Sequence, residues 1–226
     1  MLDKKKWQEL LKKAKKGDAE AQIDVGLIYS DGYINPKQDV IVKKNNKLAY
    51  EWYKKAVEQG SVIGIDFLAY HLDCGIGCER DTKKAIELYK IAINKGSSGA
   101  ANNLGTIYRD KGNYKKAFEY YDLSMRIAGS DYSLTVGLCY LYGLGVQQDK
   151  SVAVRHFRKV SADKLNNQCQ FDRDIANYYL GIFYLTGEGL KKSLKLAKKY
   201  FELANIDNDN EGALTLSQLI GWTKKA

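Results

Sequence analysis

Histidine and cysteine are the residues of this chain whose types and spacing could do chemistry. The sequence holds only two histidines and four cysteines, at His71, His156, Cys74, Cys78, Cys139 and Cys169. The spacing of His71, Cys74 and Cys78 could bring three metal ligands to one end of a helix. A fourth ligand at a matching spacing is absent, and zinc sites normally contain a tighter Cys-x2-Cys pair. We therefore expect no metal and no other cofactor, and free thiols in a reducing compartment.

Three Gly-x-Gly segments could suggest a loop that holds phosphate groups. They are Gly75-Ile76-Gly77, Gly143-Leu144-Gly145 and Gly187-Glu188-Gly189. Each follows a predicted helix rather than a strand, and none continues as Gly-x-Gly-x-x-Gly, so the context of a nucleotide-binding loop is missing. We interpret them as turns in which glycine supplies a positive φ. No Ser-His-Asp arrangement and no pair of carboxylates stands out, so the sequence predicts a protein that is not an enzyme.

The elements that would position these residues repeat along the chain. A Gly or Ala that follows a larger residue recurs at Gly26, Ala69, Gly105, Gly137 and Gly181. An alanine opens a second motif at Ala49, Ala85, Ala117, Ala153 and Ala197. Repeats of this period are typical of a solenoid, in which each unit buries its apolar face against its neighbours. The single proline, Pro36, agrees with an all-helical chain.

The second motif carries the pattern of a helix that packs closely. An aromatic residue follows each alanine by four positions, at Tyr53, Tyr89, Tyr121, Phe157 and Phe201. A small or β-branched residue follows three positions later, and positions i, i+4 and i+7 share one helix face. We expect each ring to fill the space between two antiparallel helices.

These residues resemble the Sel1-like repeat branch of the tetratricopeptide superfamily. The last repeat carries most of the resemblance, in Ala176, Leu180-Gly181, Tyr184, Gly187-Glu188-Gly189, Ala197, Tyr200-Phe201 and Ala204. The resemblance spans roughly residues 17 to 205. It implies an all-α solenoid superhelix of about five helix pairs. Capping helices are expected at both ends.

The expected organisation is one repeat domain over residues 1–226. A capping helix at 1–16 precedes repeats at 17–60, 61–96, 97–129, 130–162 and 170–205, and a closing helix takes 206–226. Two insertions, Tyr33–Asn46 and Asp163–Gln170, are expected to form surface loops, either merely tolerated or close to the binding face.

The resemblance implies that the first helix of each pair lines a concave binding surface. Matching positions around the motif glycine give the candidate site Asp66, Tyr70, Asp73, Asn102, Asn103, Thr106, Arg109, Leu138, Tyr178 and Tyr179. The polar side chains of Asn102, Asn103 and Arg109 are hard to explain as packing, whereas Asn and Arg suit a peptide backbone and a carboxylate. For Leu138, packing against the next repeat stays an equal alternative.

The charge bears on the partner and on location. The chain has 36 basic and 27 acidic residues, a net charge of +9, which favours an acidic protein or peptide. Lysine pairs such as Lys83-Lys84 and Lys115-Lys116 are expected on the solvated outer face; nucleic-acid binding to that face is the alternative function.

The basic N-terminal helix around Trp7 is expected to cap the first repeat rather than to bind a membrane. Without a leader or an apolar stretch of membrane length, we expect a cytoplasmic monomer or weak dimer.

The sequence therefore predicts a non-catalytic scaffold or adaptor that binds protein. The resemblance also includes bacterial proteins with regulatory roles and immunity proteins that neutralise a toxin. The net charge of +9 argues against a nucleic-acid-degrading toxin as the target, because such toxins are usually basic.

Overall fold

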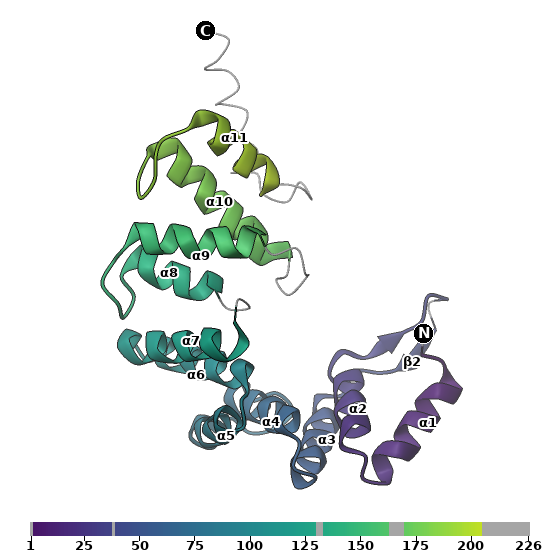
Figure 1. The fold of residues 1–226 in the computed structure, drawn as a ribbon. Helices are drawn as coiled ribbons and strands as arrows, with labels where there is room; N and C mark the ends of the chain where they lie inside the picture. The colour runs from purple at the N-terminus through teal and green to yellow at the C-terminus, as the bar shows by residue number, and fades with distance from the viewer. Residues whose placement is uncertain (1, 38, 130–132, 163–169, 205–226) are drawn as a thin grey trace. The chain divides into compact units, whose positions relative to one another are not determined.

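The structure is a computed structural model that describes residues 2–37, 39–129, 133–162 and 170–204. Within these residues it contains eleven α-helices and one two-stranded sheet (Figure 1). The chain divides into two compact units, Met1–Leu104 (unit 1) and Gly105–Ala226 (unit 2), with the division inside helix α6. The prediction of one domain over residues 1–226 stays a prediction.

The helices follow one another in pairs. Unit 1 contains α1 (Lys4–Lys15), α2 (Ala19–Asp31), α3 (Asn46–Glu58), α4 (Val62–Cys74), α5 (Thr82–Asn94) and the start of α6 (Ser98–Asp110). Unit 2 contains the rest of α6, then α7 (Tyr114–Ala128), α8 (Ser133–Tyr142), α9 (Lys150–Ala162), α10 (Gln170–Thr186) and α11 (Leu194–Leu203). The predicted all-α repeat fold is confirmed.

Helix α1 covers the first pair, and the buried side chains of Trp7 and Ala14 belong to the same core cluster as Val25 of α2. The closing helix predicted for residues 206–226 lies outside the described residues.

Short polar residues determine where many helices begin. Their side chains accept a hydrogen bond from the backbone N–H three residues later, which satisfies a donor that the helix leaves free. These capping residues are Asp3, Asp18, Asn45, Ser61, Asp81, Asn113 and Ser193.

The ring of the second motif forms the core of each pair, as its spacing predicts. The rings of Tyr53, Tyr89, Tyr121, Phe157 and Phe201 are at most 4% exposed. Where the first motif has glycine, the ring occupies the space that a Cβ atom would need: a Cβ on Gly181 would lie 2.4 Å from Phe201. The absent side chain therefore allows the two helices of a pair to approach closely.

The Gly-x-Gly turns join the two helices of a repeat and contact the repeat before it. All six of their glycines have positive φ, as expected for turns. The second glycine of each turn also lies against the start of the second helix in the preceding repeat: Gly77 against Asn46, Gly145 against Tyr114 and Gly189 against Lys150.

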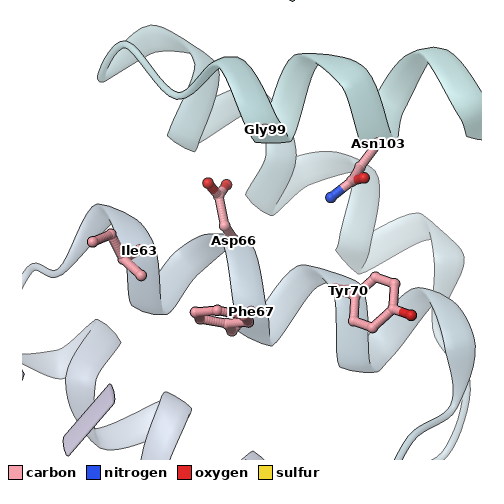
Figure 2. Close-up of a pocket in the computed structure, with 6 residues that line it drawn as sticks. All are labelled: Ile63, Asp66, Phe67, Tyr70, Gly99 and Asn103. Atoms are coloured by element: carbon pink, nitrogen blue, oxygen red, sulfur yellow. The ribbon is translucent and has the colours of Figure 1, made fainter. Parts of the chain in front are cut away.

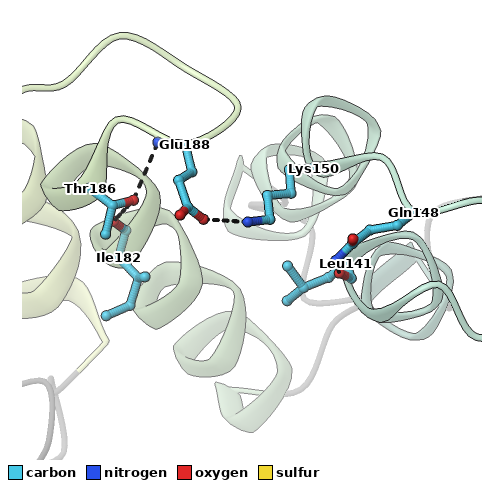
Figure 3. Close-up of polar contacts among 6 residues, drawn as sticks. All are labelled: Leu141, Gln148, Lys150, Ile182, Thr186 and Glu188. Atoms are coloured by element: carbon cyan, nitrogen blue, oxygen red, sulfur yellow. Dashed lines mark hydrogen bonds and ion pairs between the residues drawn. The ribbon is translucent and has the colours of Figure 1, made fainter.

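In the last repeat an ion pair supports the same contact. The Lys150 Nζ donates to the Glu188 carboxylate at 2.5 Å, between the start of α9 and the α10–α11 turn (Figure 3). Thr186 holds the turn, because its hydroxyl accepts from the Glu188 N–H at 3.3 Å and donates to the Ile182 carbonyl at 3.0 Å.

The insertion at 33–46 differs from the expected loop, because it forms a β-hairpin. Strand β1 (Tyr33–Ile34) pairs antiparallel with β2 (Val40–Val42). The β-branched residues of β2 favour extended backbone, and the Asn35 side chain accepts from the Lys37 and Asp39 N–H groups in the connecting turn. Val42 is buried in the same cluster as Trp7 of α1. Of the second insertion, residues 163–169 lie outside the described residues.

Candidate functional site

A pocket of about 370 Å³ lies between α4 and the first turns of α6 in unit 1. Figure 2 shows the side chains that line it: Ile63, Asp66, Phe67, Tyr70, Gly99 and Asn103. The carboxylate of Asp66 and the amide of Asn103 point into the space between the two helices, with the rings of Phe67 and Tyr70 on the α4 side (Figure 2).

A second pocket, of about 660 Å³, adjoins the first and shares Ile63 and Phe67 with it. Its other lining residues are Ala19, Glu20, Ile23, Asp24, Leu27, Gln59, Gly60 and Ser61. Together the two pockets form a hollow across α2, α4 and the start of α6, which are the first helices of three successive pairs. We refer to these fourteen lining residues as the first-helix groove.

Asp66 is held in the groove by Ser97. The Ser97 hydroxyl donates to Asp66 Oδ2 and accepts from the Ala100 N–H at 3.1 Å, so the residue that caps α6 also orients the carboxylate. The other oxygen, Oδ1, is buried and has no hydrogen-bond partner in the described part of the chain. Burial raises the pKa of Asp66 above its ordinary value, and the bond from Ser97 offsets part of this rise.

The buried hydroxyl of Tyr89 and Oδ1 of Asp73 also lack hydrogen bonds within the described residues, and Asp73 Oδ1 lies 3.8 Å from the Arg80 guanidinium. Tyr89 is fully buried, and its pKa is raised, first by burial and then by the carboxylate of Asp73. The side chain of Asn103 offsets part of this rise. Unpartnered buried polar atoms are rare in folded proteins, and a bound water, ion or ligand is one explanation for them.

The sign of the charge differs between the two kinds of helix in unit 1. The charged residues of the first helices, which are α2, α4 and residues 98–104, are all acidic: Glu20, Asp24, Asp31, Asp66 and Asp73. Lysines are concentrated on α1, α3 and α5. Lys83 and Lys84 of α5 are exposed. The groove is therefore acidic in a chain whose net charge is +9.

Replacing Asp66 by asparagine is expected to raise the melting temperature at neutral pH by about 1–3 °C. Because the folded state raises the pKa of Asp66, it holds this proton more firmly than the unfolded chain does. The ionised carboxylate therefore costs stability above the raised pKa, and this cost disappears as the pH falls below 3.8. Asparagine keeps an acceptor for Ser97 without the charge.

Differential scanning calorimetry at pH 7 and pH 3 measures this effect. The difference between Asp66→Asn and the unchanged chain should be present at pH 7 and close to zero at pH 3. A lower melting temperature for the variant at pH 7 would contradict the assignment.

The structure places three of the predicted site residues, Asp66, Tyr70 and Asn103, around one pocket. Asp73 lies at the end of α4 outside the lining, 3.8 Å from the Arg80 guanidinium, and Asn102 is half-buried without lining either pocket. The sequence analysis missed the apolar floor of the groove, above all Ile63 and Phe67.

The predicted residues of unit 2 make contacts within that unit. The Thr106 hydroxyl lies 3.3 Å from that of Tyr121, and Arg109 is paired with Asp110 at 2.9 Å. Leu138 packs against the core between α8, α9 and α10, which agrees with the packing alternative.

The two predicted tyrosines of unit 2 belong to one aromatic cluster. The ring of Tyr179 stacks on Phe157, and its hydroxyl lies 2.7 Å from that of Tyr142. Tyr178 contacts the Tyr179 ring edge-on. The role of these residues in binding stays a prediction.

The histidines have structural partners. His71 is buried, its Nδ1 lies 2.7 Å from the Ile76 carbonyl oxygen, and burial lowers its pKa. His156 stacks on Tyr140, and burial lowers its pKa as well.

Among the described residues no group of His, Cys, Asp and Glu is placed to hold a metal ion, and Cys74, Cys78 and Cys139 are free thiols. In the same residues no helix has the length and apolar character needed to cross a membrane.

Comparison with known proteins identifies the repeats. The Sel1 repeat pattern matches residues 19–61, 64–97, 98–124, 136–162 and 174–206. The rat protein sel-1 homolog 2 is 30% identical over 151 residues, which are 58% of this chain and 22% of that protein. This chain thus spans about a fifth of the length of that relative.

Solved structures show the same fold. A Sel1 repeat protein from Oxalobacter formigenes has a TM-score of 0.69 at 20% identity, over 92% of this chain and 88% of that one. An immunity protein from Pseudomonas aeruginosa has a TM-score of 0.54 at 20% identity, over 82% of this chain and 64% of that one. At these identities the likeness establishes the fold.

Proposed function

The chain belongs to the Sel1 repeat family, whose repeats generally mediate protein–protein interaction without catalysis, and from this premise we propose that its first-helix groove binds a segment of a partner protein. The groove is lined by side chains on helices whose opposite faces are packed in the core. The groove is therefore formed before a partner arrives. A preformed site avoids the entropic cost of ordering these side chains on binding.

The observation that carries the proposal is the exposure of apolar side chains beside unpaired polar atoms. Ile63 is 59% exposed and Tyr70 is 44% exposed, and both line the groove next to the buried, unpartnered Oδ1 of Asp66. A partner segment that covers Ile63 and donates to Asp66 would remove both unfavourable features together.

Within this class we propose a regulatory or toxin-neutralising role in the cytoplasm. The likeness of fold to the immunity protein from Pseudomonas aeruginosa supports this role. The basic outer helices remain available for contacts outside the groove.

In affinity capture from the source cells, the Ile63→Ser variant is expected to lose the native partner that the unchanged chain retains. Quantitative mass spectrometry measures the amount of each captured protein. The groove loses a large apolar contact, while the fold loses little because Ile63 is mostly exposed. The matched control is Ile91→Ser, since Ile91 is 46% exposed on α5 of the same unit and lies outside the groove.

A protein that Ile91→Ser retains and Ile63→Ser loses would support binding in the groove. Equal retention by both variants would place the binding site elsewhere on the chain. Loss with Ile91→Ser alone would assign it to the outer helices.

A further inference from the structure

We infer that the first-helix groove selects a cationic partner segment with apolar side chains, although the chain as a whole carries a net charge of +9. This inference rests on the proposed function, because it names the chemistry of the segment that the groove would bind.

The charges that line the groove have one sign. Its lining residues include three carboxylates, of Glu20, Asp24 and Asp66, and no lysine or arginine. Lys15, the last residue of α1, and Lys16, which follows it, precede α2 in sequence, but neither lines a pocket. Charges separated by more than about 8–10 Å are largely screened at physiological salt. A bound segment would therefore respond most strongly to charges among the residues that line the groove, and these are carboxylates.

The carboxylates alternate with apolar side chains along the groove. Ile23 and Leu27 of α2 belong to the same pocket as Glu20 and Asp24. Ile63 and Phe67 of α4 flank Asp66 in sequence and join the two pockets. A segment with basic and apolar residues close together would match both components of this surface.

Asp66 gives the most specific contact. Among the described residues its Oδ1 is buried without a hydrogen-bond donor, while its Oδ2 is already bonded to Ser97. A lysine ammonium has three N–H donors and an arginine guanidinium has five, so either would supply the missing bond together with the opposite charge. Asn103, on the opposite wall, has an amide suited to the backbone of an extended segment.

An acidic segment or a nucleic-acid phosphate does not fit this groove. Either would bring negative charge against three carboxylates, and like charges placed together cost several kcal/mol in an interface. Partners of that kind would have to bind the lysine-bearing helices.

The test is the selection of a random 12-residue peptide library, displayed on phage, against the immobilised chain. Selected peptides are then synthesised and their affinities measured by fluorescence polarisation. We expect enrichment of peptides that combine Lys or Arg with Leu, Ile, Phe or Trp. The double variant Asp24→Asn/Asp66→Asn should bind them roughly tenfold more weakly.

The matched control is Glu9→Gln/Glu87→Gln, which removes two exposed carboxylates from α1 and α5. It should bind the selected peptides as tightly as the unchanged chain does. Circular dichroism of each variant shows whether the fold is retained.

Ile63→Ser separates failure of the inference from failure of the proposed function. Acidic or uncharged peptides that lose affinity on Ile63→Ser would overturn the cationic chemistry and leave the groove as the binding site. Peptides indifferent to Ile63→Ser and to the Asp24→Asn/Asp66→Asn variant would refute both. Self-association of the chain in analytical ultracentrifugation, lost in the Asp24→Asn/Asp66→Asn variant, would make a second copy the occupant and would overturn the assignment to a separate partner protein.

Discussion

Gly145→Ala is expected to lower the free energy of unfolding by about 3–5 kcal/mol, since it combines backbone strain with overpacking. Gly145 has a φ of 75°, which L-residues rarely adopt. A Cβ atom there would lie 2.0 Å from the carbonyl oxygen of Tyr114, in the first turn of α7. Because the obstacle is backbone, it cannot move aside as a flexible side chain could. Urea unfolding followed by circular dichroism measures the loss.

Gly112→Ala is the matched control in the same unit. Gly112 has a φ of 73°, but among the described residues no atom beyond its chain neighbours lies within 4 Å of the position that its Cβ would take. This variant should therefore lose only about 1 kcal/mol, from the strained backbone alone. Equal losses in the two variants would show that the Gly-x-Gly turns need glycine only for its φ and not for contact between repeats.

Phe157→Ala is expected to cost about 3–5 kcal/mol, the usual effect of removing a large side chain from a core. The Phe157 ring is 0% exposed, stacks on Tyr179 with 5.2 Å between ring centroids and lies near Phe183. The vacated space lies between α8, α9 and α10, whose backbones are fixed by other contacts and cannot collapse fully into it. We expect scanning calorimetry to show a fall in melting temperature of roughly 10 °C.

Phe171→Ala makes the same chemical change at a surface position. Phe171 lies on α10 and is 68% exposed, so its removal should change stability by no more than about 0.5 kcal/mol. A loss at Phe171 as large as the loss at Phe157 would contradict the assignment of the core.

The helix pairs could be predicted because the residue spacing that specifies each helix is local and recurs along the chain. The spacing from Ala153 to Phe157 to Val160 defines one helix face in any context, and the structure buries all three side chains. The hairpin at 33–42 could not be predicted in this way. It depends on the packing of Val42 in the same core cluster as Trp7 of α1, which is distant in sequence.

The groove could be predicted only in part, for a related reason. Asp66, Tyr70 and Asn103 occupy first-helix positions that the repeat defines, so their common location followed from the resemblance. Ile63 and Phe67 did not stand out, because an apolar residue on a helix is usually buried, and nothing local marks Ile63 as 59% exposed.

The prediction of an acidic partner depended on the net charge of the whole chain. A net charge of +9 predicts an acidic partner only where basic residues line the site. The distribution between the two kinds of helix was present in the sequence, since α2 and α4 contain Asp24 and Asp66 but no lysine. Charge summed for each helix, rather than for the whole chain, would have indicated the sign of the groove.

The contact made by the second glycine of each Gly-x-Gly turn has a consequence for how repeat proteins gain new repeats and change in sequence. In all three turns the glycine meets the second helix of the preceding repeat without a side chain of its own, while the residue between the glycines differs: it is Ile76, Leu144 or Glu188. The glycine contact itself requires no co-evolving pair of side chains, and the Lys150–Glu188 ion pair is an addition in the last repeat. A duplicated or transplanted repeat can therefore fit its new neighbour at once, and the groove residues are left to mutate toward a new partner.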